Sequence, residues 1–531
     1  MKALCTAAAL LLFVCPGQSQ GITSQDLLDG LKDPSRWLMY SGDYSGRRHS
    51  PLTQITPANV GQLTPQWTFQ TGVLGKFEAT PIVIDGVLYY TGQNNNAWAI
   101  DARTGRSLWR YQRTLPAGLS VCCGNVNRGF AVYRDRLIMA TLDAHLVALE
   151  MKTGKVIYDV PIDDFKLGYT ATVAPLIVKD KVIVGIAGAE FGIRGFLDAF
   201  DAETGKRSWR FWTVPEKGQP GSETWQGDSW LHGGGPTWVT GSYDPELNLL
   251  YWGVGNPGPD YNGDVRKGDN LYTNSLVALD PETGKLRWHY QFTPHDTHDW
   301  DSNHTPVLAD LDVNGVKRKL VMVANRNGFF YTLDRTDGKL LVGKAFVNQT
   351  WAKEIGPDGR PVVLPNTEPT DQGTPVCPDL FGATNFMPPS FNPETKLFYV
   401  TARETCGTYF KREDAYETGG RYEGGGMRRT GDSRYGAIRA IDPLTGERRW
   451  EYRYAAPSFA GNLSTASGLV FTGDADGYAM ALDARTGALL WRYSTGSAIY
   501  APPATFSLDG RQYLLMPSGT TLTAFALPER N

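Results

Sequence analysis

The sequence predicts an eight-bladed β-propeller, an all-β ring of four-stranded sheets. A unit of the form AxDxxTGxxxW recurs along the 531 residues, first as AIDARTGRSLW from Ala99 and last as ALDARTGALLW from Ala481. Short runs rich in β-branched residues, such as 81–90 and 175–186, lie between the copies. Short strands separated by turn signals favour a propeller over alternating strands and helices.

Each copy of the unit is expected to form one hairpin. The first strand ends at the Asp, the Gly supplies the positive φ of the turn, and the second strand begins near the Trp. The other copies begin at Ala199, Ala278 and Ala440, with degenerate ones at Ala148 and Thr332. Successive copies are 41 to 54 residues apart except for intervals of 79 and 108, which indicate blades with insertions.

An eighth unit is expected to be split between the two ends of the chain. Residues 522–527 (LTAFAL) have the form of the first strand without a turn, and residues 66–72 (QWTFQTG) have the form of the second strand. Pairing of these segments would close the ring and remove two exposed sheet edges. The large aromatic rings of the repeats are expected to pack between blades.

Residues 1–20 have the features of a secretory signal peptide: a Lys at position 2, an apolar run at 7–14 and small residues near position 17. We therefore expect residues 21–531 to be exported, here to the periplasm, and to fold as one propeller domain. The net charge is −3, and no run of Lys or Arg indicates a nucleic-acid partner. No later window is apolar for about 18 residues, so no membrane span is expected.

Four cysteines follow the predicted leader. Cys377 and Cys406 are 29 residues apart and are expected to form an ordinary structural disulfide in an oxidising compartment. Cys122 and Cys123 are adjacent, and their Cα atoms would lie about 3.8 Å apart, below the usual disulfide range. The residues alone leave two alternatives for this pair, a strained disulfide or two buried thiols.

Seven motifs lie in order between the repeats. They are CCGNVNRG from Cys122, GAEFGIRG from Gly188, GGGPTW from Gly233, GVGNPGP from Gly253, DWD from Asp299, NRNGFFYTLDRTDG from Asn325 and GATNFMPPSFNP from Gly382. Together they resemble the pyrroloquinoline quinone (PQQ)-dependent alcohol dehydrogenases of the methanol and ethanol dehydrogenase group. The resemblance runs from Arg47 to the last repeat, and it implies a soluble periplasmic eight-bladed propeller that oxidises alcohols to aldehydes.

The resemblance implies a binding site for the planar quinone. A Cys122–Cys123 disulfide would cover one face of PQQ, and Trp238 would stack on the other. The further cofactor contacts implied are Glu78, Arg128, Thr172, Arg326 and Asn385. Cationic side chains suit the three carboxylates of PQQ.

The same resemblance implies a metal site and a catalytic base. Glu190 and Asn256 match metal ligands, whose oxygen donors suit a hard cation. Asp299 matches the base that takes the hydroxyl proton while hydride passes to the quinone. The metal would act as a Lewis acid on the quinone carbonyl.

The residue two after the base indicates which metal. Calcium-dependent members of the family have a small or uncharged residue there, whereas lanthanide-dependent members have a second Asp, and this chain has Asp301. With Glu190 and Asp299 it makes three carboxylates, which a trivalent ion would balance. A lanthanide is therefore favoured. Calcium is the alternative, because glucose dehydrogenases with a similar Asp pair use divalent ions.

Other features leave the substrate and the partners open. His232, Ala187 and Phe459 depart from the family pattern, and a zinc site among the four histidines of 289–304 is a minor alternative. The chain has no CxxCH haem motif, so a separate soluble cytochrome c is expected as the electron acceptor. A homodimer stays open. The Gly/Arg-rich segment 418–436 is interpreted as a long surface loop, with a docking or lid role as the alternative.

Two rival functions remain. A sugar or polyol dehydrogenase of the same superfamily would share the fold and PQQ. A non-enzymatic propeller scaffold would have no need for Glu190, Asn256 and Asp299.

Overall fold

A computed structural model of the chain describes residues 21–430 and 434–529, so the expected leader at 1–20 lies outside the described residues. Within these ranges strands dominate, and α1 (Ser24–Asp29) is the only α-helix. The 3₁₀ turns are η1 (Gly30–Lys32), η2 (Val60–Gln62), η3 (Gln93–Asn95), η4 (Phe165–Leu167), η5 (Ala189–Phe191), η6 (Ser222–Thr224), η7 (Ser229–His232) and η8 (Gly263–Val265). None of the described helices is long and apolar enough to cross a membrane.

Seven four-stranded sheets and one five-stranded sheet make up the body of the described chain. The first four contain β3 (Ile82–Ile84), β4 (Val87–Thr91), β5 (Ala97–Asp101) and β6 (Ser107–Tyr111); β7 (Ala131–Tyr133), β8 (Arg136–Ala140), β9 (His145–Glu150) and β10 (Val156–Pro161); β11 (Leu176–Val178), β12 (Lys181–Gly185), β13 (Phe196–Asp201) and β14 (Arg207–Trp212); and β15 (Ser242–Asp244), β16 (Leu249–Gly253), β17 (Ser275–Leu279) and β18 (Leu286–Gln291).

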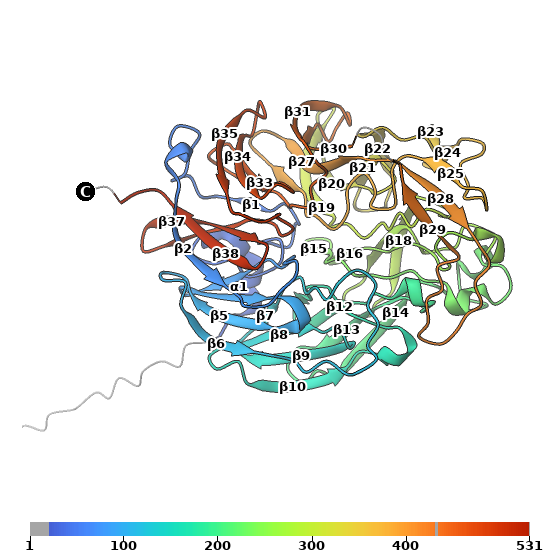
Figure 1. Cartoon of the computed structure of the whole chain (residues 1–531), viewed down its shortest axis with the longest axis horizontal. Coiled ribbons are helices and arrows are strands. Elements are labelled where there is room, and N and C mark those ends of the chain that lie inside the picture. Colours follow the sequence, from blue (N-terminus) through green and yellow to red (C-terminus); the bar gives the residue numbers. More distant parts are fainter. Residues whose placement is uncertain (1–20, 431–433, 530–531) are drawn as a thin grey trace, which may run out of the picture.

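The other four sheets follow in chain order. They contain β19 (Val307–Val313), β20 (Val316–Ala324), β21 (Phe329–Asp334) and β22 (Leu340–Ala345); β26 (Ser390–Asn392), β27 (Leu397–Glu404), β30 (Tyr435–Ile441) and β31 (Arg448–Tyr454); β1 (His49–Ser50), β32 (Leu463–Thr465), β33 (Leu469–Gly473), β34 (Tyr478–Asp483) and β35 (Leu489–Ser494); and β36 (Ala504–Leu508), β37 (Arg511–Ser518), β38 (Thr521–Ala526) and β2 (Thr64–Gln70). Figure 1 shows the sheets arranged around a common centre.

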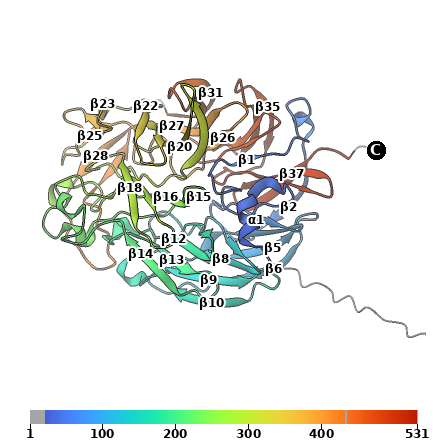
Figure 2. The ribbon, with the colours of Figure 1, turned by 180° about the vertical axis from the view of Figure 1, so that it is seen from behind.

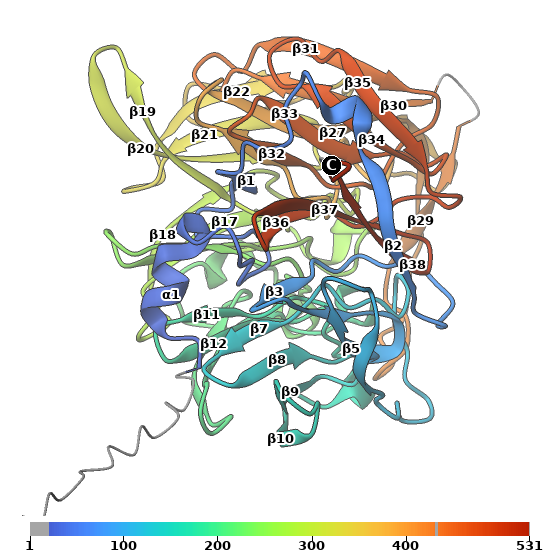
Figure 3. The same ribbon diagram turned by 90° about the vertical axis from the view of Figure 1, so that its left-hand side faces the viewer.

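Strand β2 pairs antiparallel with β38, so the two half-units at the ends of the chain lie in one sheet (Figure 1). A second contact between distant segments is made by β1, which pairs in parallel with β32. Helix α1 lies on the face opposite the one in Figure 1 (Figure 2), and the β19–β20 hairpin projects on that same side (Figure 3).

The seven repeats form the hairpins expected from the sequence. In the first, Gly105 N donates to Asp101 O at 2.8 Å, and Gly105 has a φ of +71°. A Cβ on Gly105 would lie 2.7 Å from the ring of Trp67, whose Nε1 donates to Ala102 O at 3.0 Å. The same contact between a turn glycine and a Trp of the preceding sheet recurs at Gly154, Gly284, Gly338 and Gly487. Glycine is therefore needed both for its backbone conformation and for its missing side chain.

The long interval before the sixth sheet contains an insertion with its own strands. They are β23 (Ala352–Ile355), β24 (Pro361–Val363), β25 (Thr374–Val376), β28 (Gly407–Lys411) and β29 (Gly425–Arg429). Strand β29 pairs with β28, so part of the segment 418–436 is a strand rather than the loop expected from the sequence. Residues 431–433 of that segment lie outside the described residues.

Candidate active site

Asp301, in the loop between β18 and β19, accepts hydrogen bonds through both carboxylate oxygens. Its Oδ2 accepts from Nη1 of Arg326 at 2.7 Å and from Nε1 of Trp238 at 3.0 Å. Its Oδ1 accepts from the backbone N of Asn256 at 3.0 Å and from Nδ2 of Asn303 at 3.3 Å. A carboxylate offers about four acceptor positions. Asp301 therefore fixes three other residues that the sequence placed in the site.

Asp299 is buried, but its carboxylate accepts no hydrogen bond from the other described residues. Nη2 of Arg326 lies 3.7 Å from its Oδ2. The backbone of Asp299 is left-handed, with a φ of +56°. Asp296 holds both flanks of this turn, since its two carboxylate oxygens accept from His298 N at 3.0 Å and from Trp300 N at 2.8 Å. A non-glycine residue keeps such a conformation only where its surroundings impose it.

Burial and like charge raise the pKa of the carboxyl groups around this turn. Burial raises the pKa of Asp299 well above its usual value; Arg326 opposes the shift, and the charges of Asp301 and Glu190 add to it. Burial likewise raises the pKa of Glu190 to about 7. The pKa of Asp260 is also raised, by burial and then by Asp299 and Glu190. Without a cation, the region therefore resists full ionisation.

A second group of polar side chains surrounds Arg128. Its Nη2 donates to Oε2 of Glu78 at 2.7 Å, and its Nη1 donates to Oγ1 of Thr172 at 2.6 Å. The guanidinium carbon lies 4.7 Å from the ring centroid of Trp238 and 5.1 Å from that of Phe386. Burial raises the pKa of Glu78, and Arg128 opposes the shift. The group therefore pairs its charges while lying against Trp238.

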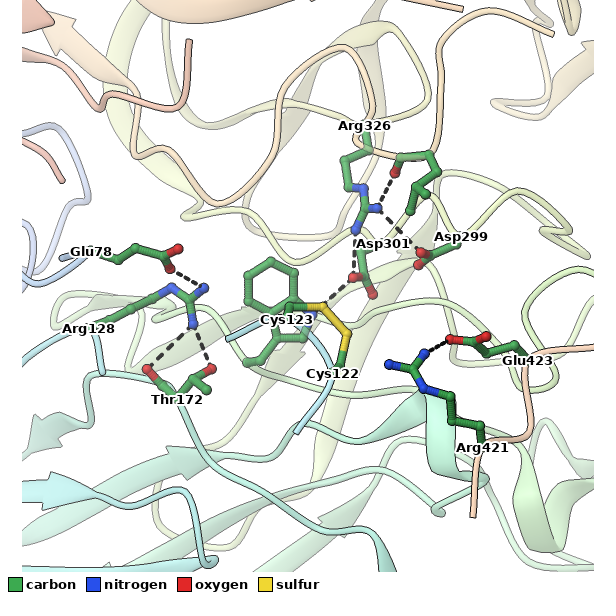
Figure 4. The surroundings of a disulfide bond; sticks show 12 residues. Glu78, Cys122, Cys123, Arg128, Thr172, Asp299, Asp301, Arg326, Arg421 and Glu423 are labelled. Atoms are coloured by element: carbon green, nitrogen blue, oxygen red, sulfur yellow. Dashed lines mark hydrogen bonds and ion pairs between the residues drawn. A yellow bond between two sulfur atoms is a disulfide. The ribbon is translucent and has the colours of Figure 1, made fainter. Parts of the chain in front are cut away.

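The disulfide between Cys122 and Cys123 lies between these two groups (Figure 4). Both sulfur atoms and a carboxylate oxygen of Glu190 lie within 4.8 Å of one another. Bonded sulfurs are not thiolates, so this set is not a metal site of the cysteine type. The second expected disulfide, Cys377–Cys406, is also present.

Asn385 lies in the loop that the Cys377–Cys406 disulfide anchors. Its Nδ2 donates to Phe381 O at 3.0 Å, so the amide fixes its own loop. The main-chain O of Asn385 lies 3.1 Å from Nδ1 of His304, whose Nε2 accepts from Arg326 N at 3.1 Å. An imidazole that accepts at Nε2 donates at Nδ1. His304 is therefore neutral and links Asn385 to Arg326.

The histidines of 289–304 do not converge on one point. Nε2 of His298 bonds to Thr367 O at 2.9 Å, and Nδ1 of His295 bonds to Gly268 O at 2.8 Å. His304 bonds to Asn385 and Arg326. Among the described residues, the only three His, Cys, Asp or Glu ligand atoms within 4.8 Å of one another are those of Cys122, Cys123 and Glu190. The histidines thus form no zinc site.

The segment 418–436 contacts the site rather than extending into solvent. Tyr422 N donates to Glu190 O at 2.7 Å, and Tyr261 N donates to Glu423 O at 2.9 Å. Figure 4 shows Glu423 and its partner Arg421 beside the disulfide. The segment therefore covers the turn that carries Glu190.

Three acidic residues near the site were not among the predicted site residues: Asp260, Asp296 and Glu423. Two of them had a signal in the sequence, because Asp260 directly follows GVGNPGP and Asp296 lies within the dense ionisable stretch before Asp299. Glu423 had none, since only the folded insertion brings it near Glu190.

Comparison with known proteins gives consistent matches. Residues 37–345 and 453–514 match the family described as PQQ: Glucose/ethanol/alcohol dehydrogenase, beta-propeller domain. Quinoprotein alcohol dehydrogenase PedH of Pseudomonas putida is 38% identical over 527 residues, which cover 94% of this chain and 88% of the relative. The lanthanide-dependent methanol dehydrogenase of Methylacidiphilum fumariolicum is 38% identical over 530 residues, 93% of this chain and 86% of the relative.

A solved structure agrees with these sequence matches. The europium-containing methanol dehydrogenase superposes with a TM-score of 0.90 at 35% identity, and the match covers 95% of this chain and all of that chain. The family match at 37–345 spans the positions of both groups of polar side chains, from Glu78 to Arg326.

Proposed function

Because this chain belongs to the family of PQQ-dependent glucose, ethanol and alcohol dehydrogenases, we propose that it oxidises primary alcohols to aldehydes with Asp299 as the catalytic base. The observation that carries this proposal is the contrast within the DWD motif. Asp301 is fully hydrogen-bonded, whereas the buried carboxylate of Asp299 accepts no hydrogen bond from the described residues and is free to accept a proton.

The residues present fit PQQ. Arg128 and Arg326 each keep a buried Nε without a hydrogen-bond partner among the described residues, which leaves donors for carboxylate or carbonyl oxygens. The indole of Trp238 is held edge-on by Asp301 and offers a flat face. Cofactor contacts at Glu78, Cys122, Cys123, Arg128, Thr172, Trp238, Arg326 and Asn385 are part of the proposal.

When bound, PQQ would supply an electrophilic carbon for the hydride, and the metal would supply Lewis acidity. The chain supplies position and proton transfer. Asp299 takes the hydroxyl proton of the alcohol at its carboxylate. Arg326, 3.7 Å from that carboxylate and bonded to Asp301, stabilises the charged form of the base. Asp296 keeps the base in its left-handed turn.

For the metal we propose the ligands Glu190, Asn256, Asp299 and Asp301, with a lanthanide favoured over Ca²⁺. The charge of three buried carboxylates calls for a strongly charged cation. Two similar proteins are named for a lanthanide, the methanol dehydrogenase of Methylacidiphilum fumariolicum and the europium-containing enzyme. Binding at Asp301 requires the ion to replace one of its four hydrogen bonds.

The remaining parts of the proposal concern the whole molecule. We propose that the eight large sheets are the blades of one ring formed by residues 21–531 and closed by β2 and β38. The protein would act in the periplasm and pass electrons to a separate soluble cytochrome c. Quinohaemoprotein relatives such as alcohol dehydrogenase ADH IIB of Pseudomonas putida are consistent with a haem acceptor.

The test is dye-linked activity of the apo-protein reconstituted with PQQ and either Ca²⁺ or La³⁺, over primary alcohols, aldoses and polyols. Aldehyde formation from primary alcohols that needs PQQ and is faster with La³⁺ supports the proposal. A preference for aldoses or polyols would favour the rival dehydrogenase function. No PQQ binding and no turnover would leave the scaffold function, and equal or higher activity with Ca²⁺ would reject the lanthanide.

A further inference from the structure

Asp260 is a buried acid whose carboxylate forms no ion pair with the described part of the chain. It follows β16 in the loop that carries Asn256, and it is 1% exposed. Its Oδ1 accepts a 2.8 Å hydrogen bond from Nδ2 of Asn256. The buried guanidinium of Arg266 donates to the main-chain O of Asp260 at 3.4 Å and not to its carboxylate. An unpaired buried carboxylate is costly unless a bound cation compensates it.

The hydrogen bond to Asp260 determines the orientation of the side-chain amide of Asn256. A carboxylate only accepts, so the Nδ2 side of the amide must point to Asp260. The second hydrogen of Nδ2 is directed to Pro257 O at 3.3 Å. The amide oxygen of Asn256, Oδ1, accepts no hydrogen bond from the described residues. A free amide oxygen next to carboxylates is a suitable ligand for a hard cation.

The charge of Asp260 acts on the same place. Asn256 donates to Asp260 through Nδ2 at 2.8 Å and to Oδ1 of Asp301 through its backbone N at 3.0 Å, so the carboxyl groups of Asp260 and Asp301 lie on either side of one proposed ligand. The Asp301 charge is already compensated by Arg326 at 2.7 Å. When a bound cation keeps Asp260 ionised, its carboxylate adds a negative charge next to the proposed metal ligands, and no ion pair with a described residue offsets that charge.

Resting on the proposed function, we propose that Asp260 is a positioning residue for the metal: it turns the Asn256 oxygen toward the ion and adds a charge that favours trivalent over divalent ions. It need not touch the ion itself. The attraction of one fixed charge for an ion grows with the charge of that ion, so its removal weakens a trivalent ion more than a divalent one.

The test compares wild type, Asp260→Asn and Asp264→Asn as full-length proteins loaded with PQQ, by titration with Eu³⁺ and separately with Ca²⁺. Asp264 is the matched control, because it loses the same charge four residues away but is exposed and paired with Lys411. We expect Asp260→Asn to lower the affinity for Eu³⁺ at least about tenfold and the affinity for Ca²⁺ by a smaller factor. Asp260→Asn keeps one acceptor oxygen for Nδ2 of Asn256, so the orienting bond is tested with Asp260→Ala, which has no acceptor. In Asp260→Ala the Eu³⁺ luminescence lifetime should indicate about one more bound water, because Asn256 is no longer oriented. The affinities of Asp264→Asn for both ions should stay within about twofold of those of wild type.

The melting temperature of the metal-free proteins separates this role from a structural one. Replacing a buried carboxyl group that has no ion-pair partner should leave the melting temperature of Asp260→Asn equal to or above that of wild type. A variant that fails to fold or melts lower without metal, or that keeps the Eu³⁺ affinity and selectivity of wild type, would overturn the inference. If wild type itself binds neither ion, the metal part of the proposed function fails as well.

Discussion

Nη1 of Arg326 donates to Oδ2 of Asp301 across 2.7 Å, and both side chains are buried. Two residues earlier in the chain, Asp299 lies 3.7 Å from the same guanidinium and has no hydrogen bond from the described residues. The two acids of the DWD motif thus differ in what they can do. Asp301 connects Arg326, Trp238 and Asn256, whereas the carboxylate of Asp299 is held by no such bond.

Asp301→Asn should destabilise the protein even without metal. Each carboxylate oxygen of Asp301 faces only donors, so the NH₂ group of an Asn would point at a donor on either side. Breaking a buried ion pair costs about 3–5 kcal/mol. Urea unfolding of the metal-free protein measures this loss. A loss no larger than that of Asp264→Asn would mean that the Arg326–Asp301 pair does not stabilise the fold.

The two disulfides should respond oppositely to removal. Replacing Cys122 and Cys123 by Ser releases a loop of almost no length, so stability should hold while PQQ retention and activity fall. Replacing Cys377 and Cys406 by Ser opens a bridge with a sequence separation of 29, which should cost about 3 kcal/mol. The measurements are melting temperature, PQQ content and activity per folded molecule. A lower melting temperature with full activity in the first variant would make the vicinal disulfide structural.

The sequence predicted the hairpins because the repeat carries their physical causes. The Asp accepts the turn hydrogen bonds, the Gly has positive φ, and the Trp needs the space that the Gly leaves, as at Gly105 and Trp67. The pairing of the end segments was predictable for the same reason, since each half carried its part of the repeat. In the segment 418–436 no period exists, and the strand Gly425–Arg429 forms only because β28 lies beside it.

Site residues were predictable where a motif contained them and not where only folding brought them together. Asp260 directly follows the GVGNPGP motif but was missed, because its bond to Asn256 depends on how that loop turns. Glu423 reaches Glu190 from an insertion more than two hundred residues away. The family resemblance predicted Arg128 and Glu78 as cofactor contacts, but only the structure shows that they form an ion pair with each other.

Glu190 should make the metal-free protein less stable as the pH rises. Its pKa is about 7 in the folded state against an ordinary value of 4.5. Between these two pH values the folded state therefore binds more protons than the unfolded state. The stabilising contribution is therefore present below about pH 4.5 and is lost as the pH rises through about 7. Unfolding free energies at several pH values should show a smaller decline for Glu190→Gln than for wild type. Equal slopes for the two proteins would contradict the raised pKa.

The same shift predicts how metal binding depends on pH. A carboxylate ligand must lose its proton before a cation binds, so the affinity of wild type should rise with pH up to about 7 and then level off. Titrations with Eu³⁺ at fixed PQQ loading measure it. An affinity that does not change across this range would remove Glu190 from the ligand set.

Asp296→Asn should lower kcat without direct contact with the substrate. Both oxygens of Asp296 accept from backbone N–H groups that flank Asp299, and an Asn has only one acceptor for the two. The turn that holds the base should then relax, with kcat falling by about tenfold and KM changing little. If KM rises with kcat unchanged, Asp296 acts on substrate binding instead of on the base.

Asp299→Asn should abolish most turnover and leave the fold intact. The carboxylate has no hydrogen bond from the described residues to lose, so the urea midpoint of the metal-free variant should not fall, in contrast to Asp301→Asn. An amide cannot take the hydroxyl proton, and kcat should decrease by at least about 10²-fold, the usual effect of losing a general base. PQQ content, read from absorbance, should stay near that of wild type because Arg128, Trp238 and Asp301 are unchanged. Near-normal kcat in a PQQ-loaded variant would exclude Asp299 as the base, whereas lost activity together with lost PQQ would mean that the residue holds the cofactor.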